Sequence, residues 1–156
     1  MGAMKMNDKE TLEFLCNRHF EASPSRLFAA WTHQAEFGGW ITPSPFHTVK
    51  TEMDLRIGGA YAVHMEGDVN GRRICGAVVG EFLEISDPHA LALSWRWSLS
   101  DMPATKVSVE FVPSGSGTDL RLIHSGFVDS TTCAEYREGW QASFQNLLLL
   151  LNGQTA

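Results

Sequence analysis

His124 is the side chain of this sequence best suited to acid–base or hydrogen-bonding chemistry. It follows Leu120 and Leu122 at two-residue spacing, which on a β-strand places all three side chains on one face. Because that face is apolar, we expect the imidazole to point inward. There it could hydrogen-bond a ligand or transfer a proton near neutral pH. A structural role is the more common one for such a residue: a buried ring hydrogen-bonded to a backbone carbonyl beside a bend at Gly126.

Wide aromatic side chains are predicted on the same inner face. Trp95 and Trp97 alternate with polar neighbours, and Tyr136, Trp140 and Phe144 recur every four residues further along the chain. Paired tryptophans more often belong to a core than to a ligand cage. An apolar cavity with a few polar groups is nevertheless the usual form of a small-molecule site. The residues expected to bind a ligand, the first two of them at the entrance, are Trp40, Phe46, Tyr61, Trp95, Phe111, His124, Tyr136, Trp140 and Phe144.

The motifs of other catalytic and metal-dependent chemistries are absent from the sequence. It has no Gly-x-Ser-x-Gly elbow, no phosphate-binding loop and no dinucleotide fingerprint. Its six histidines and three cysteines show none of the usual zinc spacings. We therefore expect no metal and no cofactor, and His124 is the catalytic candidate if the protein is an enzyme.

Composition limits the partners and the compartment. The formal net charge of −6 disfavours binding to nucleic acid or to anionic lipid. No apolar run reaches the roughly 18 residues of a membrane span, and the N-terminus lacks the apolar segment of a signal peptide. Widely spaced cysteines in odd number are typical of a reduced protein. We expect a cytoplasmic protein whose partner is a small apolar or aromatic molecule, and an antiparallel edge strand leaves a homodimer open.

Periodicity and turn residues predict the elements that position the aromatic residues. A strand over 11–20 precedes two short helices, one starting at Ser23-Pro24 and the other over 34–40. Strands joined by short turns then fill 46–126. Their clearest turn is Asn70-Gly71, because both residues accept the positive φ that a tight hairpin needs. Consecutive strands on short turns imply an antiparallel meander.

One long helix is predicted at the end of the chain. Apolar residues recur there at three- and four-residue steps until Gly153, which is suited to ending a helix. Thr132 and Glu135 have the spacing of a capping box at its start. We expect Gly139, which lacks a side chain, to let this helix pack closely against its neighbours.

The order of elements predicts an α+β fold. A twisted antiparallel sheet of about six to seven strands would pack around the long C-terminal helix, with two short helices after the first strand. Because a twisted sheet is concave, a straight helix crossing it leaves space for large side chains or for a ligand. We expect a single domain over 11–153, with residues 1–10 disordered or a cloning remnant and residues 154–156 a tail.

Four segments in this order resemble a known superfamily. They are 29–43 with its two tryptophans, DLRIGGAY at 54–61, GEFLEI at 80–85 leading to LSWRW at 93–97, and HSGF at 124–127 followed by Gly139-Trp140. The chain is similar in these segments to START-like (SRPBCC) proteins, and most similar to the group named after the activator of the heat-shock protein 90 ATPase. The resemblance implies a helix-grip fold and a deep hydrophobic pocket. Relatives include lipid carriers, polyketide cyclases, antibiotic-sequestering proteins and chaperone co-factors, so function must be argued from the site.

Three functions are compatible with these observations. The first is a protein that holds a small apolar or aromatic molecule between sheet and helix. The second is a cyclase or dehydratase that uses the same cavity, with His124 transferring the proton and Tyr61 assisting. The third is a chaperone-interacting module, which would need an exposed patch. Binding is favoured over catalysis because the inner face is predicted to carry one clearly polar residue.

Overall fold

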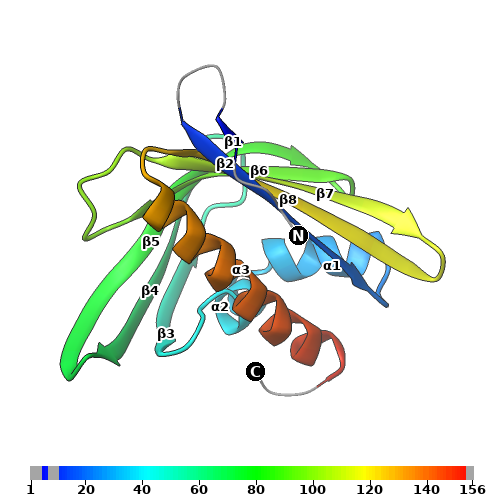
Figure 1. The fold of residues 1–156 in the computed structure, drawn as a ribbon. Coiled ribbons are helices and arrows are strands. Elements are labelled where there is room, and N and C mark those ends of the chain that lie inside the picture. The colour runs from blue at the N-terminus through cyan, green and yellow to red at the C-terminus, as the bar shows by residue number, and fades with distance from the viewer. Residues whose placement is uncertain (1–4, 7–10, 154–156) are drawn as a thin grey trace.

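The computed structural model describes residues 5–6 and 11–153, which form one antiparallel sheet and three helices (Figure 1). The sheet has eight strands in the order β1-β2-β8-β7-β6-β5-β4-β3. The strands are β1 (Lys5–Met6), β2 (Leu12–Phe20), β3 (Phe46–Met53), β4 (Ala60–Val69), β5 (Arg72–Ser86), β6 (Ala90–Trp97), β7 (Thr105–Ser114) and β8 (Gly117–Phe127). The predicted α+β, helix-grip architecture is confirmed, and β1 extends the sheet beyond the six to seven strands expected.

The short strand β1 lies within residues 1–10, which were expected to be disordered or a cloning remnant. Lys5 and Met6 pair with Glu13 and Leu12 at the start of β2. The rest of that expectation, and the expected tail at 154–156, lie outside the described residues. None of the helices described is long and apolar enough to cross a membrane.

Turn residues behave as the sequence predicts at the β4–β5 hairpin. Asn70 and Gly71 have φ angles of 52° and 78°, and the ladder closes directly beside them with Val69 opposite Arg72. This hairpin matters for the site because it fixes the register of two strands that line the cavity described below.

The two short helices are α1 (Pro24–Thr32) and α2 (Gln34–Trp40), close to their predicted bounds. The side chain of Ser23 caps α1 by accepting a hydrogen bond from the backbone N–H of Arg26 at 3.1 Å. An extended His33 separates the two helices. Both helices are amphipathic and bury their aromatic residues beneath the sheet.

The long helix α3 (Ser130–Leu151) begins earlier than the predicted capping box. Asp129 is its N-cap, and the carboxylate accepts from both the backbone N–H of Thr132, at 2.7 Å, and the Thr132 hydroxyl, at 2.9 Å. The box between Thr132 and Glu135 was therefore wrong, because an aspartate three residues earlier satisfies the same free N–H groups. Gly153 ends the helix with φ 76°.

Helix α3 crosses one face of the sheet, α2 packs against its C-terminal half, and α1 packs against α2 and the sheet (Figure 1). Ser143 donates a hydrogen bond to the carbonyl of Ile41 at 2.7 Å, which joins α3 to the end of α2. The ring of Trp31 on α1 stacks on Trp140 with a centroid distance of 5.7 Å. These contacts fill one half of the space between sheet and helix, and they leave the half under the N-terminal turns of α3 less filled.

Candidate ligand-binding site

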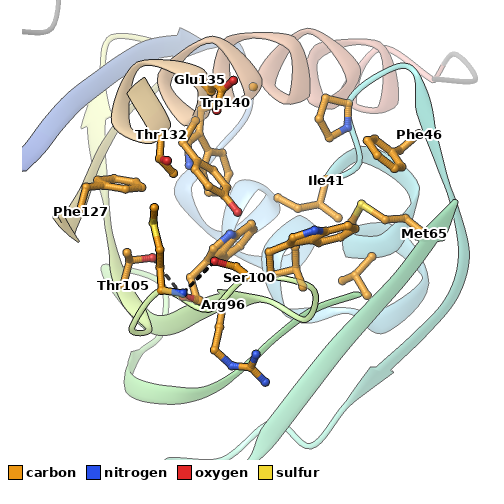
Figure 2. A pocket seen from close by; sticks show the side chains of 18 of the residues that line it. Ile41, Phe46, Met65, Arg96, Ser100, Thr105, Phe127, Thr132, Glu135 and Trp140 are labelled. Carbon is orange, nitrogen blue, oxygen red and sulfur yellow. Dashed lines mark hydrogen bonds between the residues drawn. The ribbon is translucent and has the colours of Figure 1, made fainter. Parts of the chain in front are cut away.

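A cavity of about 540 Å³ lies between the sheet and the N-terminal half of α3 (Figure 2). This volume falls in the usual range for small-molecule pockets, roughly 300–1,000 Å³. Most of its lining is apolar. The lining residues are Ile41, Pro43, Phe46, Val63, Met65, Val69, Ile74, Val78, Trp95, Arg96, Trp97, Ser100, Met102, Pro103, Thr105, Gly126, Phe127, Val128, Thr132, Glu135, Tyr136, Gly139, Trp140 and Ser143.

Strand alternation positions the floor of the cavity. Val63 and Met65 are two apart on β4 and are both buried, and Trp95 and Trp97 have the same spacing on β6. The roof comes from α3, where Tyr136 and Trp140 are one turn apart. In Figure 2, Trp140 and Thr132 reach down from the helix, with Phe127 on one side and Ile41 and Phe46 on the other.

Two exposed apolar residues lie at the opening of the cavity. Met102, in the loop between β6 and β7, and Val128, between β8 and α3, are 37% and 54% exposed while they line the cavity. Of the two residues predicted at the entrance, Phe46 lines the cavity and packs edge-on against Trp97 at 5.8 Å. Trp40 does not line it: its side chain is fully buried and its indole N–H donates to the carbonyl of Ala30 at 2.9 Å.

Four of the nine predicted site residues line the cavity: Phe46, Trp95, Tyr136 and Trp140. The other five, Trp40, Tyr61, Phe111, His124 and Phe144, are buried outside its lining. Phe111 packs against Phe28 and Trp31, so α1 occupies the space that a ligand would need there. The Tyr61 hydroxyl donates to the carbonyl of Ser94 at 2.7 Å, which ties it to the neighbouring strand.

Several lining residues were not predicted. Val63 and Met65 share the strand face of Tyr61, so the alternation that selected Tyr61 also points to them. Thr105 begins β7 on the same strand face as Val107 and Val109, so strand alternation points to it as well. Met102 had no comparable signal, because it lies in a loop and loop residues follow no period. Gly139 was expected to allow close packing, and this was wrong: a Cβ atom there would meet no atom within 4 Å, because the position faces the open cavity.

His124 is enclosed in a hydrogen-bonded group behind the cavity wall. Its Nδ1 accepts from the indole N–H of Trp140 at 3.0 Å, and its Nε2 lies 2.7 Å from the hydroxyl oxygen of Thr105. That hydroxyl donates to the carbonyl of Trp95 at 3.0 Å. Since Nδ1 accepts and the Thr105 proton is used elsewhere, Nε2 must carry the ring proton and donate it to Thr105. Every polar atom of the ring therefore has a partner.

Burial keeps His124 neutral. The ring is fully buried, and burial lowers its pKa from 6.5 to about 3. With its proton on Nε2, the ring has no free lone pair to accept a proton from Thr105 or from a molecule in the cavity. The arrangement suits a structural role, in which His124 orients Trp140 and Thr105. Its partners are side chains rather than the backbone carbonyl that the structural interpretation expected.

The described residues do not form a metal site. No group of three or more histidine, cysteine, aspartate and glutamate side chains with suitable placement occurs among them. The three cysteines are unpaired, and Cys16 and Cys133 are buried while Cys75 is exposed. The chemistry available around the cavity is therefore apolar packing and a few hydrogen-bond donors.

The family model for activator of Hsp90 ATPase homolog 1-like proteins matches residues 21–152. A solved AHSA1 protein from Silicibacter pomeroyi is 25% identical, with a TM-score of 0.77 over 90% of this chain and 97% of that one. A protein from Arthrobacter aurescens is 20% identical, with a TM-score of 0.78 over 97% and 91% of the two chains. CalU16 from Micromonospora echinospora is 19% identical, with a TM-score of 0.67 over 93% of this chain and 80% of that one. At these identities the Arthrobacter aurescens protein and CalU16 show the shared fold alone. A comparison with curated proteins finds no match. The chain belongs to the activator of Hsp90 ATPase homolog 1-like family.

Proposed function

We propose that this protein is a cytoplasmic binding protein that holds a small hydrophobic or aromatic molecule in the cavity beneath α3. The observation that carries the proposal is a cavity of about 540 Å³ that is lined by tryptophan, tyrosine, phenylalanine, methionine and valine side chains. Burying an apolar molecule there would remove both its surface and that of the lining from water, which favours binding by about 25 cal/mol per Å².

The residues proposed to contact the ligand are the aromatic ones on either side of the cavity. Trp95 and Trp97 provide the sheet side and Tyr136 and Trp140 the helix side. Aromatic walls on two sides suit a flat or polycyclic molecule, because ring faces can stack on it at low entropic cost. Tyr61, Phe111 and Phe144 support this wall from the core and do not touch the ligand.

We propose binding rather than catalysis because His124 is neutral and both of its ring nitrogens are hydrogen-bonded. A cyclase or dehydratase would need an acid or base with an available proton or lone pair inside the cavity. The one histidine near the cavity is neutral and has both ring nitrogens engaged. A chaperone-interacting role is not favoured by any contact or surface described above.

Filling the cavity from Gly139 tests the proposal. In Gly139→Leu the new side chain would enter the open space beside Trp140, and replacing a helical glycine raises helix propensity by about 1 kcal/mol. The variant should therefore fold. Gly39→Leu is the matched control, since Gly39 is also helical and open to substitution but is exposed on α2.

The measurement is a titration with the fluorescent apolar probe N-phenyl-1-naphthylamine. We expect the wild-type protein and Gly39→Leu to bind the probe with micromolar affinity. Gly139→Leu should bind it at least tenfold more weakly, which corresponds to about 1.4 kcal/mol. Absence of probe binding to the wild type, or equal binding by all three proteins, would show that the cavity is not the binding site.

A further inference from the structure

Two hydrogen-bond donors lie next to each other at the cavity, the indole N–H of Trp95 and the hydroxyl of Tyr136. Trp95 is 6% exposed, and its indole Nε1 has no hydrogen-bond partner among the residues described. It lies beside the Tyr136 hydroxyl, close enough to influence the ionisation of that group. Both residues line the cavity. An unsatisfied buried donor is costly, so a native structure that contains one calls for an explanation.

The Tyr136 hydroxyl keeps its proton at neutral pH. Burial raises its pKa, and the adjacent indole of Trp95 opposes only part of that rise. The hydroxyl therefore remains a donor. If the Trp95 N–H donates to the hydroxyl oxygen, the hydroxyl proton of Tyr136 still has no acceptor. If it does not donate there, both the indole proton and the hydroxyl proton lack an acceptor. In either case the pair presents at least one free donor to the cavity.

Three hydroxyl groups of the lining already donate to acceptors within the protein. The hydroxyls of Ser143, Thr132 and Thr105 donate to the carbonyl of Ile41, the carboxylate of Asp129 and the carbonyl of Trp95, respectively. The second unpartnered indole of the described core, that of Trp31, does not line the cavity. Of the buried donors without a partner among the described residues, the Trp95 indole N–H is therefore the one that lines the cavity.

The charges around the cavity determine what kind of acceptor fits. Arg96 and Glu135 are the charged residues of the lining, and both are exposed. Figure 2 shows the Arg96 side chain pointing away from the cavity and Glu135 at its upper edge. His124, behind the wall, is neutral. A ligand carboxylate placed between Trp95 and Tyr136 would be buried without a counter-charge, which is strongly unfavourable.

We propose that the ligand is a largely apolar ring system with one neutral carbonyl oxygen, as in an aryl ketone, a quinone or a lactone, and that Tyr136 and Trp95 bind this oxygen. This inference rests on the proposed function, because it specifies the chemistry of a ligand for the same cavity. The Tyr136 hydroxyl donates to the carbonyl oxygen, and the Trp95 N–H donates either to the same oxygen or to the hydroxyl. The remainder of the ligand packs against the aromatic walls.

The test compares two ligands of nearly equal shape, 1-tetralone and tetralin, which differ by the carbonyl oxygen. Each is used to displace N-phenyl-1-naphthylamine from the wild type, from Tyr136→Phe and from Trp95→Phe. Tyr61→Phe is the matched control, because Tyr61 is the other tyrosine of the chain and its hydroxyl is bonded to Ser94 outside the cavity. Circular dichroism verifies that each variant is folded.

We expect Tyr136→Phe to weaken 1-tetralone binding roughly fivefold, the usual effect of one neutral hydrogen bond, and to leave tetralin binding within about twofold. Trp95→Phe should cause a loss in the same direction, and Tyr61→Phe should change neither ligand. The carboxylate analogue 1,2,3,4-tetrahydro-1-naphthoate should bind more weakly than 1-tetralone.

Three results would overturn the inference while leaving the proposed function intact. In the first, Tyr136→Phe affects both ligands equally, as expected if water satisfies the donors. In the second, it affects neither. In the third, the carboxylate binds more tightly than the ketone. If neither ligand displaces the probe and the probe itself does not bind, the proposed function fails together with the inference.

Discussion

The neutral, buried state of His124 predicts a specific dependence of stability on pH. In the folded protein burial lowers the pKa of this ring to about 3, whereas an exposed histidine in the unfolded chain titrates near 6.5. As the pH falls below about 6.5, the unfolded chain takes up a proton that the folded protein does not. Stability is therefore complete above that pH and is lost progressively between about pH 6.5 and pH 3.

The magnitude follows from the distance between the two pKa values. Each pH unit inside that window costs up to about 1.4 kcal/mol. At pH 5, about 1.5 units below the unfolded pKa, the contribution is about 2 kcal/mol. His19 contributes a pH dependence of its own, because hydrogen bonds to Asp119 and Glu21 raise its pKa. The prediction therefore concerns a difference between two proteins that both contain His19. His124→Gln is the reference variant, because glutamine can accept from Trp140 and donate to Thr105 but does not titrate.

The assay is urea unfolding of both proteins at several pH values from 7.5 to 5. The wild type should lose about 2 kcal/mol more than His124→Gln over this range. Parallel loss in the two proteins would refute the reasoning, because it would mean that His124 accepts a proton in the folded state as readily as in the unfolded chain. His124 would then again be a candidate for proton transfer to a molecule in the cavity.

Two further substitutions, and a third that serves as a control, test the contacts that hold the roof of the cavity by denaturant unfolding. Trp140→Phe keeps an aromatic ring but removes the donor to His124 Nδ1, so it should cost about 1–3 kcal/mol, and a cost near zero would contradict the hydrogen bond. Asp129→Ala removes the N-cap of α3 and should lower the free energy of unfolding by about 0.5–2 kcal/mol. Glu135→Ala should change it by less than about 0.5 kcal/mol. The reverse order would support the capping box between Thr132 and Glu135.

Much of the fold could be predicted from local rules. The Asn70-Gly71 hairpin, the cap at Ser23 and the apolar stripe of α3 each depend on neighbouring residues in the sequence, so periodicity and turn chemistry were sufficient. The N-cap of α3 was misplaced because the spacing of Thr132 and Glu135 selected Thr132, although Asp129, three residues earlier, is also a residue type that caps helices. The sequence does not show which of them takes the extended conformation of an N-cap.

The site was less predictable because it depends on contacts between distant segments. Strand and helix periods correctly placed Trp95, Trp140 and Phe111 on the inner side. They could not show that α1 would fill one half of that space, which makes Phe111 a core residue and leaves Trp95 at the cavity. Whether Gly139 meets a neighbour or open space depends likewise on where the helix lies over the sheet.

The central claim, that an apolar molecule occupies this cavity, can be tested by following the indole N–H signals of the five tryptophans by NMR during titration with N-phenyl-1-naphthylamine. Trp95 and Trp97 line the cavity, while the indole of Trp40 is bonded to Ala30 in the core outside it. We expect the Trp95 and Trp97 signals to shift with probe concentration and the Trp40 signal to stay in place. Shifts confined to Trp40, or probe binding without a change at Trp95 or Trp97, would contradict this claim.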